Sequence, residues 1–121
     1  MRYSKTHEWI DKVGEHYRVG ISNYAQEHLS DLTFVECIPE NTSVEKGKRM
    51  GTIESVKSAE DFYAPCSLKI IKINPAIADT PEIINKDAEK DGWIAEVRPT
   101  DEKELEELMD AAAYKEYLKG L

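Results

Sequence analysis

Lys57 is the residue whose surroundings most clearly suggest a chemical role. It lies in a short polar break at 55–58, between a predicted strand at 49–54 and a strand-like run at 61–64 that Pro65 ends. A lysine at such a hairpin tip holds its ammonium group away from the core, within reach of a modifying enzyme. Swinging-arm cofactors such as lipoamide and biotin are attached to lysines of this kind. The spacing also fits an unmodified turn lysine, which is the commoner case.

The other reactive side chains form no recognisable catalytic or metal-binding pattern. Cys37 and Cys66 lack CxxC spacing and have no adjacent histidine, which argues against a metal site. Both lie in apolar strand contexts, where cysteine acts as a small hydrophobic residue. An enzyme that uses one of them as a nucleophile is therefore the weaker interpretation. We expect His7 and His16 on the surface or in packing.

Alternating apolar and polar residues predict a series of short strands. These lie at 16–21, 32–38, 49–54, 61–64, 68–73 and 92–97. The out-of-phase Ile70-Ile71 step predicts a bulge or burial on both faces. A short helix capped by Ser22 or Asn23 should run through Ser30. A last helix opens at Asp101, with Glu104 as its capping-box partner.

The apolar residues indicate how these elements pack. In the last helix they follow helical spacing, at Leu105, Leu108, Met109 and Ala112. The large aromatic residues assigned to the core are Trp9, Trp93, Phe34 and Phe62. Short strands followed by a terminal helix favour an antiparallel sandwich with helical additions.

Composition limits the classes of partner. The chain has 121 residues, which suits one domain, and a formal net charge of −8. An acidic surface repels nucleic-acid phosphates and anionic membranes, so neither is expected as a partner. It suits transient docking on basic patches of larger proteins. Without a signal peptide or a long apolar run, the expected location is the cytoplasm.

The segment around Lys57 resembles a known attachment motif. Glu54-Ser55-Val56-Lys57-Ser58-Ala59 is similar to the lipoyl attachment sequence Glu-Ser-Val-Lys-Ala of glycine cleavage H-proteins. The resemblance extends along nearly the whole chain, in order and spacing. It includes Thr6-His7-Glu8-Trp9, Val19-Gly20-Ile21, Tyr24-Ala25-Gln26-Glu27-His28-Leu29, Ala64-Pro65, Ile73-Asn74, Pro81-Glu82-Ile83-Ile84-Asn85 and Gly92-Trp93.

This resemblance implies a mostly β, hammerhead (barrel-sandwich hybrid) fold. It would consist of two small antiparallel sheets, a lipoyl hairpin, short helices and a C-terminal helix at about 101–119, with a lipoyl-type core at about 17–98. The implied function is that of a non-enzymatic carrier with lipoate on Lys57. Glycine decarboxylase would load an aminomethyl group, an aminomethyltransferase would unload it, and dihydrolipoamide dehydrogenase would reoxidise the dithiol. A lipoate ligase or lipoyl transferase would attach the cofactor.

Further site residues follow only from the resemblance. Glu8 and Asp61 match family acids that line a cleft for the loaded arm, and His28 matches a position near that arm. Glu54 is a candidate for recognition by the lipoylating enzyme. Each could instead be an ordinary surface side chain.

Three residues depart from the family pattern. Ser30 stands where the family usually has glycine, and Asn41 replaces a glycine in a proline turn. Asn tolerates left-handed backbone geometry. Leu68 occupies a usual turn glycine of lipoyl and biotinyl domains, so we expect ordinary β geometry there and a loss of stability in Leu68→Gly.

Other carrier functions remain open at this point. A lipoylated relay protein that donates lipoate to other carriers would share the same motif. A biotin carrier usually has Met-Lys-Met and a 2-oxoacid dehydrogenase domain usually has Asp-Lys, whereas this chain has Val56-Lys57-Ser58. An unmodified adaptor is the least specific alternative.

Overall fold

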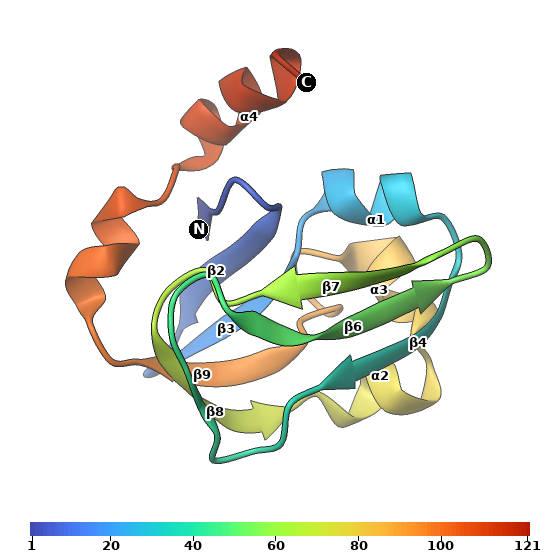
Figure 1. Cartoon of the computed structure of the whole chain (residues 1–121), viewed down its shortest axis with the longest axis horizontal. Coiled ribbons are helices and arrows are strands. Elements are labelled where there is room, and N and C mark those ends of the chain that lie inside the picture. The colour runs from blue at the N-terminus through green and yellow to red at the C-terminus, as the bar shows by residue number, and fades with distance from the viewer.

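The computed structural model describes all 121 residues and contains two antiparallel sheets (Figure 1). The larger sheet has the strand order β1 (Arg2–Tyr3), β2 (Glu8–Val13), β3 (His16–Ile21), β9 (Ala95–Pro99), β8 (Leu68–Ile73) and β5 (Ser43–Val44). The smaller sheet consists of β4 (Leu32–Cys37), β6 (Arg49–Ser55) and β7 (Ala59–Tyr63). The mostly β fold class predicted from the sequence is confirmed.

The main hydrophobic core joins residues from both sheets, because alternate side chains of each strand point inward. Its fully or nearly fully buried members include Ile10, Val19, Met50, Ile53, Leu68, Ile70 and Ile94. The pairing of β8 with β9 shifts register between Ile70 and Lys72. This shift is the bulge that the Ile70-Ile71 step predicted. It places an extra residue in β8, so two consecutive isoleucines fit into a strand that remains paired with β9.

A second bulge explains a wrong prediction. Phe34 was expected in the core, but its side chain is 47 % exposed. The β4–β6 pairing shifts register between Leu32 and Phe34, so Leu32 is buried while Phe34 lies opposite Glu54 on the outer face. Without the bulge, residues two apart would share a face. The other aromatic residues assigned to the core, Trp9, Phe62 and Trp93, are buried as expected.

The short helices pack at one end of the sheets. They are α1 (Asn23–Leu29), α2 (Pro75–Asp79) and α3 (Glu82–Asp87). The N-cap of α1 is Ser22, whose side chain accepts a hydrogen bond from the backbone N–H of Ala25. The strand predicted at 92–97 begins later, at Ala95, and extends further, to Pro99.

The predicted single helix at 101–119 is wrong. The chain instead forms a 3₁₀ helix, η1 (Glu102–Glu107), and a separate helix, α4 (Ala111–Lys119). Between them, Leu108 is extended and Met109 exchanges two backbone hydrogen bonds with Tyr3, at 2.8 and 2.9 Å. Asp110 then caps α4 by accepting from the N–H of Ala113. Backbone pairing with β1 therefore replaces helical bonds that the apolar spacing alone would favour.

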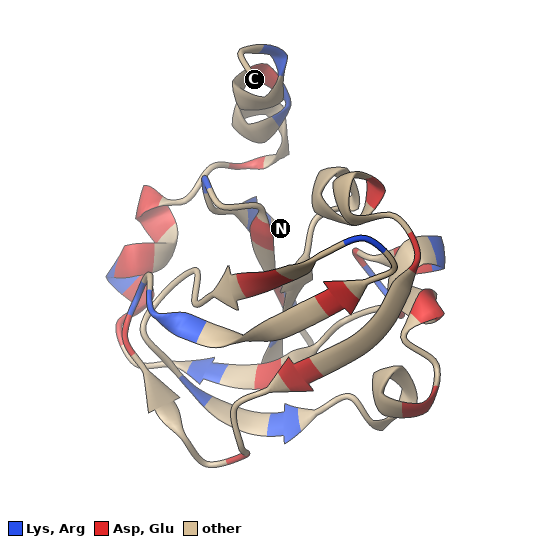
Figure 2. Cartoon of the chain, turned by 45° about the vertical axis from the view of Figure 1, so that its right-hand side comes forward, with Lys and Arg blue, Asp and Glu red and all other residues tan.

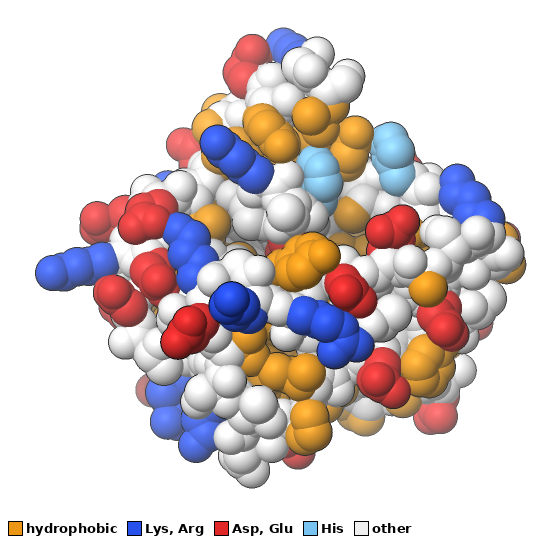
Figure 3. Space-filling model, in the orientation of Figure 1, with side chains coloured by type: hydrophobic (Ala, Val, Ile, Leu, Met, Phe, Trp, Pro, Cys, Tyr) orange, Lys and Arg blue, Asp and Glu red, His pale blue; other side chains and the backbone are white.

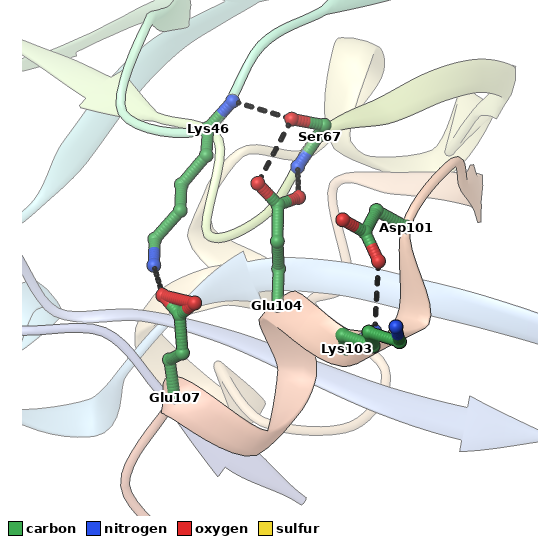
Figure 4. Close-up of polar contacts among 6 residues, drawn as sticks. All are labelled: Lys46, Ser67, Asp101, Lys103, Glu104 and Glu107. Atoms are coloured by element: carbon green, nitrogen blue, oxygen red, sulfur yellow. Dashed lines mark hydrogen bonds and ion pairs between the residues drawn. The ribbon is translucent and has the colours of Figure 1, made fainter.

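Glu104 has a tertiary role instead of a capping one. Its carboxylate accepts hydrogen bonds from the backbone N–H of Ser67, at 2.8 Å, and from the Ser67 hydroxyl (Figure 4). The neighbouring Lys46–Glu107 ion pair also joins η1 to the turn before β6. Asp101 caps η1 through the N–H of Lys103. These contacts attach the C-terminal segment to the two-sheet body.

The departures from family glycines have different structural outcomes. Ser30 has φ 67° and ψ −153°, and Asn41 has φ 70°, so both lie where glycine is favoured. Asn41 is therefore the glycine substitute that the sequence predicted. Leu68 does not have a positive φ, and it lies in β8, which confirms its expected β geometry. Its side chain is completely buried.

We expect Ser30→Gly to stabilise the protein by about 0.5–2 kcal/mol. The φ/ψ region of Ser30 is populated almost only by glycine and costs a non-glycine residue roughly 1–3 kcal/mol. Added entropy of the unfolded chain offsets about 0.4–1 kcal/mol of the gain. Urea unfolding measures the change, with Ser30→Ala as the control that keeps a β-carbon. Equal stability of the two variants would contradict the prediction.

Candidate functional site

The turn that carries Lys57 is held in a defined shape by its own serines. The N–H of Ser55 donates to the carbonyl of Ser58 at 2.8 Å, and the Ser55 hydroxyl oxygen accepts from the N–H of Ser58 at 3.2 Å. The N–H of Val56 donates to the carbonyl of Asp31, which anchors the turn to the start of β4. Lys57 itself is exposed. The hairpin therefore presents a free lysine on a fixed base.

A groove of about 520 Å³ lies beside this lysine, between the loop at 6–8, helix α1 and the β6–β7 hairpin. We call it the hairpin groove. Its apolar lining includes Ile21, Leu29, Ile53 and Phe62. Its charged and polar lining includes Glu8, His28, Lys57, Glu60 and Asp61. In the space-filling view, pale-blue histidine side chains and red carboxylate side chains border this recess (Figure 3). The structure thus brings four of the five predicted site residues together.

Glu8 contributes a buried carboxylate to the hairpin groove. Only 3 % of the residue is exposed. Its Oε1 accepts hydrogen bonds from the hydroxyls of Ser4 (2.8 Å) and Thr6, and its Oε2 accepts from the N–H of Tyr63 at 3.0 Å. Burial raises the pKa of Glu8, while these donors act in the opposite direction. The Glu8 carboxylate is therefore held in place by the loop at 4–6 and by the end of β7.

The strand register separates Glu60 from Asp61. Glu60 lies directly opposite Ile53, so its side chain is on the same face of the sheet as the apolar lining. Asp61 lies opposite Thr52 on the other face, where it accepts from Thr52 Oγ1 at 3.0 Å and pairs with Arg49. Both residues border the hairpin groove, but Glu60 has the carboxylate without a protein partner. The sequence analysis did not identify Glu60. Its position two residues before Phe62 in the same strand indicates that the two side chains share a face.

The two histidines at the groove belong to an aromatic stack. The His7 ring lies 4.6 Å from the Tyr24 ring, and Tyr24 lies 4.1 Å from His28. Nδ1 of His28 is 3.0 Å from the carbonyl of Tyr24 in its own helix. His7 was expected to be only a surface or packing residue. It has a φ of 75° and lines the hairpin groove, which the sequence did not indicate.

Glu54 lies apart from the groove. It pairs with Phe34 across β4–β6, and so it faces outward. Figure 2 shows acidic residues along the strands of this smaller sheet, close to the single basic tip of the hairpin. Glu54 is therefore accessible to a protein that approaches Lys57 from outside, rather than part of the cavity.

The structure limits other site types. No group of three or more His, Cys, Asp or Glu side chains is arranged to hold a metal ion. None of the helices has the length and apolar character needed to cross a membrane. Burial raises the pKa of Cys37 to about 11 and that of Cys66 to about 12, so neither thiol is activated as a nucleophile.

Two antiparallel sheets with an exposed hairpin lysine beside a partly apolar groove define a carrier protein of the swinging-arm class. Comparison with known families is more specific. Residues 1–121 match the sequence model of the family described as glycine cleavage H-protein. The chain belongs to this family, the lipoyl-carrying shuttle proteins of the glycine cleavage system.

Individual relatives agree along nearly the full length. The chain is 45 % identical to the glycine cleavage system H protein of Bartonella quintana over 113 residues, 93 % of each chain. It is 45 % identical to that of Thermotoga maritima over 116 residues, which cover 96 % of this chain and 94 % of the relative. The crystal structure of the H protein from Mycobacterium marinum is similar, with a TM-score of 0.86 and 36 % identity, covering 98 % of this chain and 95 % of the other.

Proposed function

We propose that this protein carries lipoate in an amide bond to Nζ of Lys57 and has no catalytic activity of its own. The observation that supports this most directly is the exposed lysine on a fixed turn that also borders the hairpin groove. The groove fits the group chemically, because its apolar side chains suit a hydrocarbon arm and its carboxylates suit a cationic cargo. When bound, the lipoyl group supplies a sulfur that carries the aminomethyl group and a dithiol that later yields two electrons.

The proposed partners are the enzymes that act on such an arm in turn. Glycine decarboxylase loads it, the aminomethyltransferase unloads it and dihydrolipoamide dehydrogenase reoxidises it, after a lipoate ligase or lipoyl transferase has attached it. The acidic chain, with a net charge of −8, supports docking on basic surfaces. A cytoplasmic location is part of the proposal, supported by two free cysteines.

Between enzymes, the hairpin groove protects the cargo. An aminomethyl thioether decomposes in water because its nitrogen can expel the thiolate. Ile53 and Phe62 exclude water from the reactive carbon, while the carboxylates of Glu8 and Glu60 bind the cationic amine. The family resemblance assigned the second acid to Asp61. The register favours Glu60 for this role, because the carboxylate of Asp61 is already paired with Arg49.

We expect Glu8→Gln and Glu60→Gln to accelerate loss of the cargo about tenfold to a hundredfold. A charge-assisted hydrogen bond contributes roughly 1.5–3 kcal/mol, which corresponds to that change in docked population. The measurement is ammonia release from isolated, loaded protein without the transferase. Lipoylation itself should remain normal in both variants, because neither residue belongs to the turn.

Asp61→Asn and Glu54→Gln are the matched controls. An exposed, ion-paired carboxylate contributes little, so Asp61→Asn should change the rate by less than about threefold. Glu54→Gln removes a charge from the outer face and should have no effect on cargo loss. A large effect of Asp61→Asn together with none of Glu60→Gln would assign the cargo site to the other face of the hairpin.

A further inference from the structure

The hydroxyl of Tyr114 connects the C-terminal helix to a residue that lines the hairpin groove. Tyr114 of α4 is buried, and its hydroxyl lies 2.8 Å from Nδ1 of His7 and 2.7 Å from Oγ of Ser22. His7 lines the groove, whereas Ser22 caps helix α1. Residues more than ninety positions apart in the chain therefore meet at the wall of the groove. No function proposed so far uses this contact.

The chemistry of the three groups determines where the protons lie. The Ser22 oxygen already accepts the N–H of Ala25 at 3.2 Å, and its own proton can go to the Tyr114 oxygen. A phenol is a stronger donor than an aliphatic hydroxyl, and an imidazole nitrogen is the strongest acceptor among them. The Tyr114 hydroxyl therefore donates to Nδ1 of His7. A neutral His7 ring must then carry its single proton on Nε2.

The surroundings keep both groups in these protonation states near neutral pH. Burial lowers the pKa of His7, and the neighbouring His28 lowers it further. Burial raises the pKa of Tyr114 to about 12, so the phenol stays protonated. The groups that face the His7 ring are Tyr24, Tyr114, Tyr117 and His28, with Glu8 next to it in the chain. The Glu8 carboxylate bonds to Ser4, Thr6 and Tyr63 instead of to His7.

We propose that Tyr114 fixes His7 as the Nε2–H tautomer, so that the hairpin groove presents a hydrogen-bond donor to an acceptor atom of the lipoyl arm. This rests on the proposed function, since the arm must enter the groove. Nε2 makes no hydrogen bond within the protein, and the ring edge that carries Nδ1 is occupied by Tyr114. The donor suits a carbonyl oxygen or a sulfur of the arm. It does not suit the cationic amine, which the carboxylates bind.

Tyr114 is thus a positioning residue that acts through His7. It gives the groove two chemically different sides, with acceptors on Glu8 and Glu60 and a donor on His7. Because α4 supplies it, the C-terminal helix takes part in the binding site without bordering the groove. The pairing of Met109 with Tyr3 holds the chain just before α4 against β1, and so helps to position Tyr114.

The first test is a two-bond ¹H–¹⁵N correlation spectrum of the unmodified, ¹⁵N-labelled protein, which shows the tautomer of each histidine. His16→Gln and His28→Gln variants assign the signals. We expect Nδ1 of His7 to be unprotonated and Nε2 to be protonated at pH 7.5. In Tyr114→Phe this preference should be lost. A protonated Nδ1 in the wild-type protein would overturn the proposal, whether or not the variant folds.

Tyr117→Phe is the matched control on the same helix. The Tyr117 ring lies 6.1 Å from the His7 ring, but its hydroxyl donates to the carbonyl of Lys5. It should leave the His7 tautomer unchanged. If Tyr117→Phe and Tyr114→Phe altered the tautomer equally, the effect would belong to α4 packing in general, and the specific role of the Tyr114 hydroxyl would be wrong.

The second test compares unmodified, octanoylated and lipoylated protein. A shift of the His7 Nε2 signal in both acylated forms identifies the amide carbonyl as the acceptor, and a shift only in the lipoylated form identifies a sulfur. Movement of groove amides such as Ala25 without any Nε2 shift would overturn the donor role while leaving the proposed function intact. If no NMR signal of a groove residue shifted in either acylated form, the arm would not enter the groove.

Discussion

Lys57→Arg should abolish lipoylation completely while leaving the fold unchanged. Arginine keeps the positive charge but has no amine that can form the amide. The Lys57 side chain is exposed and makes no ion pair, so its replacement should change the free energy of unfolding by less than about 0.5 kcal/mol. Intact mass spectrometry after incubation with a lipoylating enzyme detects the missing mass increment.

Lys48→Arg is the control, because Lys48 is exposed at the other end of β6 and forms no ion pair. It should be lipoylated as the wild type is. Peptide mapping should find the lipoyl group on residue 57 alone. Lipoate on a different lysine, or activity in a reconstituted glycine cleavage assay with Lys57→Arg, would refute the attachment site.

The second large effect concerns the core. Leu68→Gly should destabilise the protein by about 3–5 kcal/mol, measured by urea unfolding. Leu68 is completely buried between the sheets, and truncation of a buried leucine to alanine typically costs about 2–5 kcal/mol. Glycine adds about 0.5–1 kcal/mol by its greater freedom in the unfolded chain. A smaller loss in Leu68→Ala would separate the cavity from the backbone contribution.

Leu68→Gly should lower the free energy of unfolding, whereas Ser30→Gly should raise it. Measuring both tests whether backbone φ decides the effect of a glycine at each position. The family resemblance leads us to expect glycine at both positions, yet only Ser30 has a positive φ. If Leu68→Gly were stabilising, the β geometry of Leu68 would be wrong. If both signs are found, a glycine expected from the resemblance is needed only where this chain has a positive φ.

Much of the candidate site could be predicted from the sequence because its elements depend on local patterns. The strands at 16–21 and 68–73 are found where alternation placed them, and the polar break at Lys57 is a turn. The motif around Lys57 occupies consecutive residues, so no tertiary information is needed to recognise it. The match of the chain to the H-protein family agrees with that interpretation.

The groove residues could be predicted only in part. Glu8 and His28 came from the family resemblance, and the structure places both at the hairpin groove. Glu60 and Asp61 are adjacent in sequence but face opposite sides of the hairpin. Which of them shares a face with the apolar lining at Ile53 depends on the register with β6, and a shift of one residue would exchange them. The role that we propose for His7 depends on its contact with Tyr114, which comes from the far end of the chain.

The sequence by itself determined the class of fold and the family, and it singled out Lys57 as the proposed attachment residue, because periodicity, turn residues and a contiguous motif are local properties. The tertiary structure alone decided three further features. A bulge turned Phe34 outward, pairing of Met109 with Tyr3 divided the last helix, and strand register placed Glu60 and Asp61 on opposite faces of the hairpin. In the first two cases the deciding interaction joins residues distant in sequence, and its backbone pairing outweighs the weaker local preference of the chain. The third depends on how the two strands of one hairpin pair, which residue types alone do not fix.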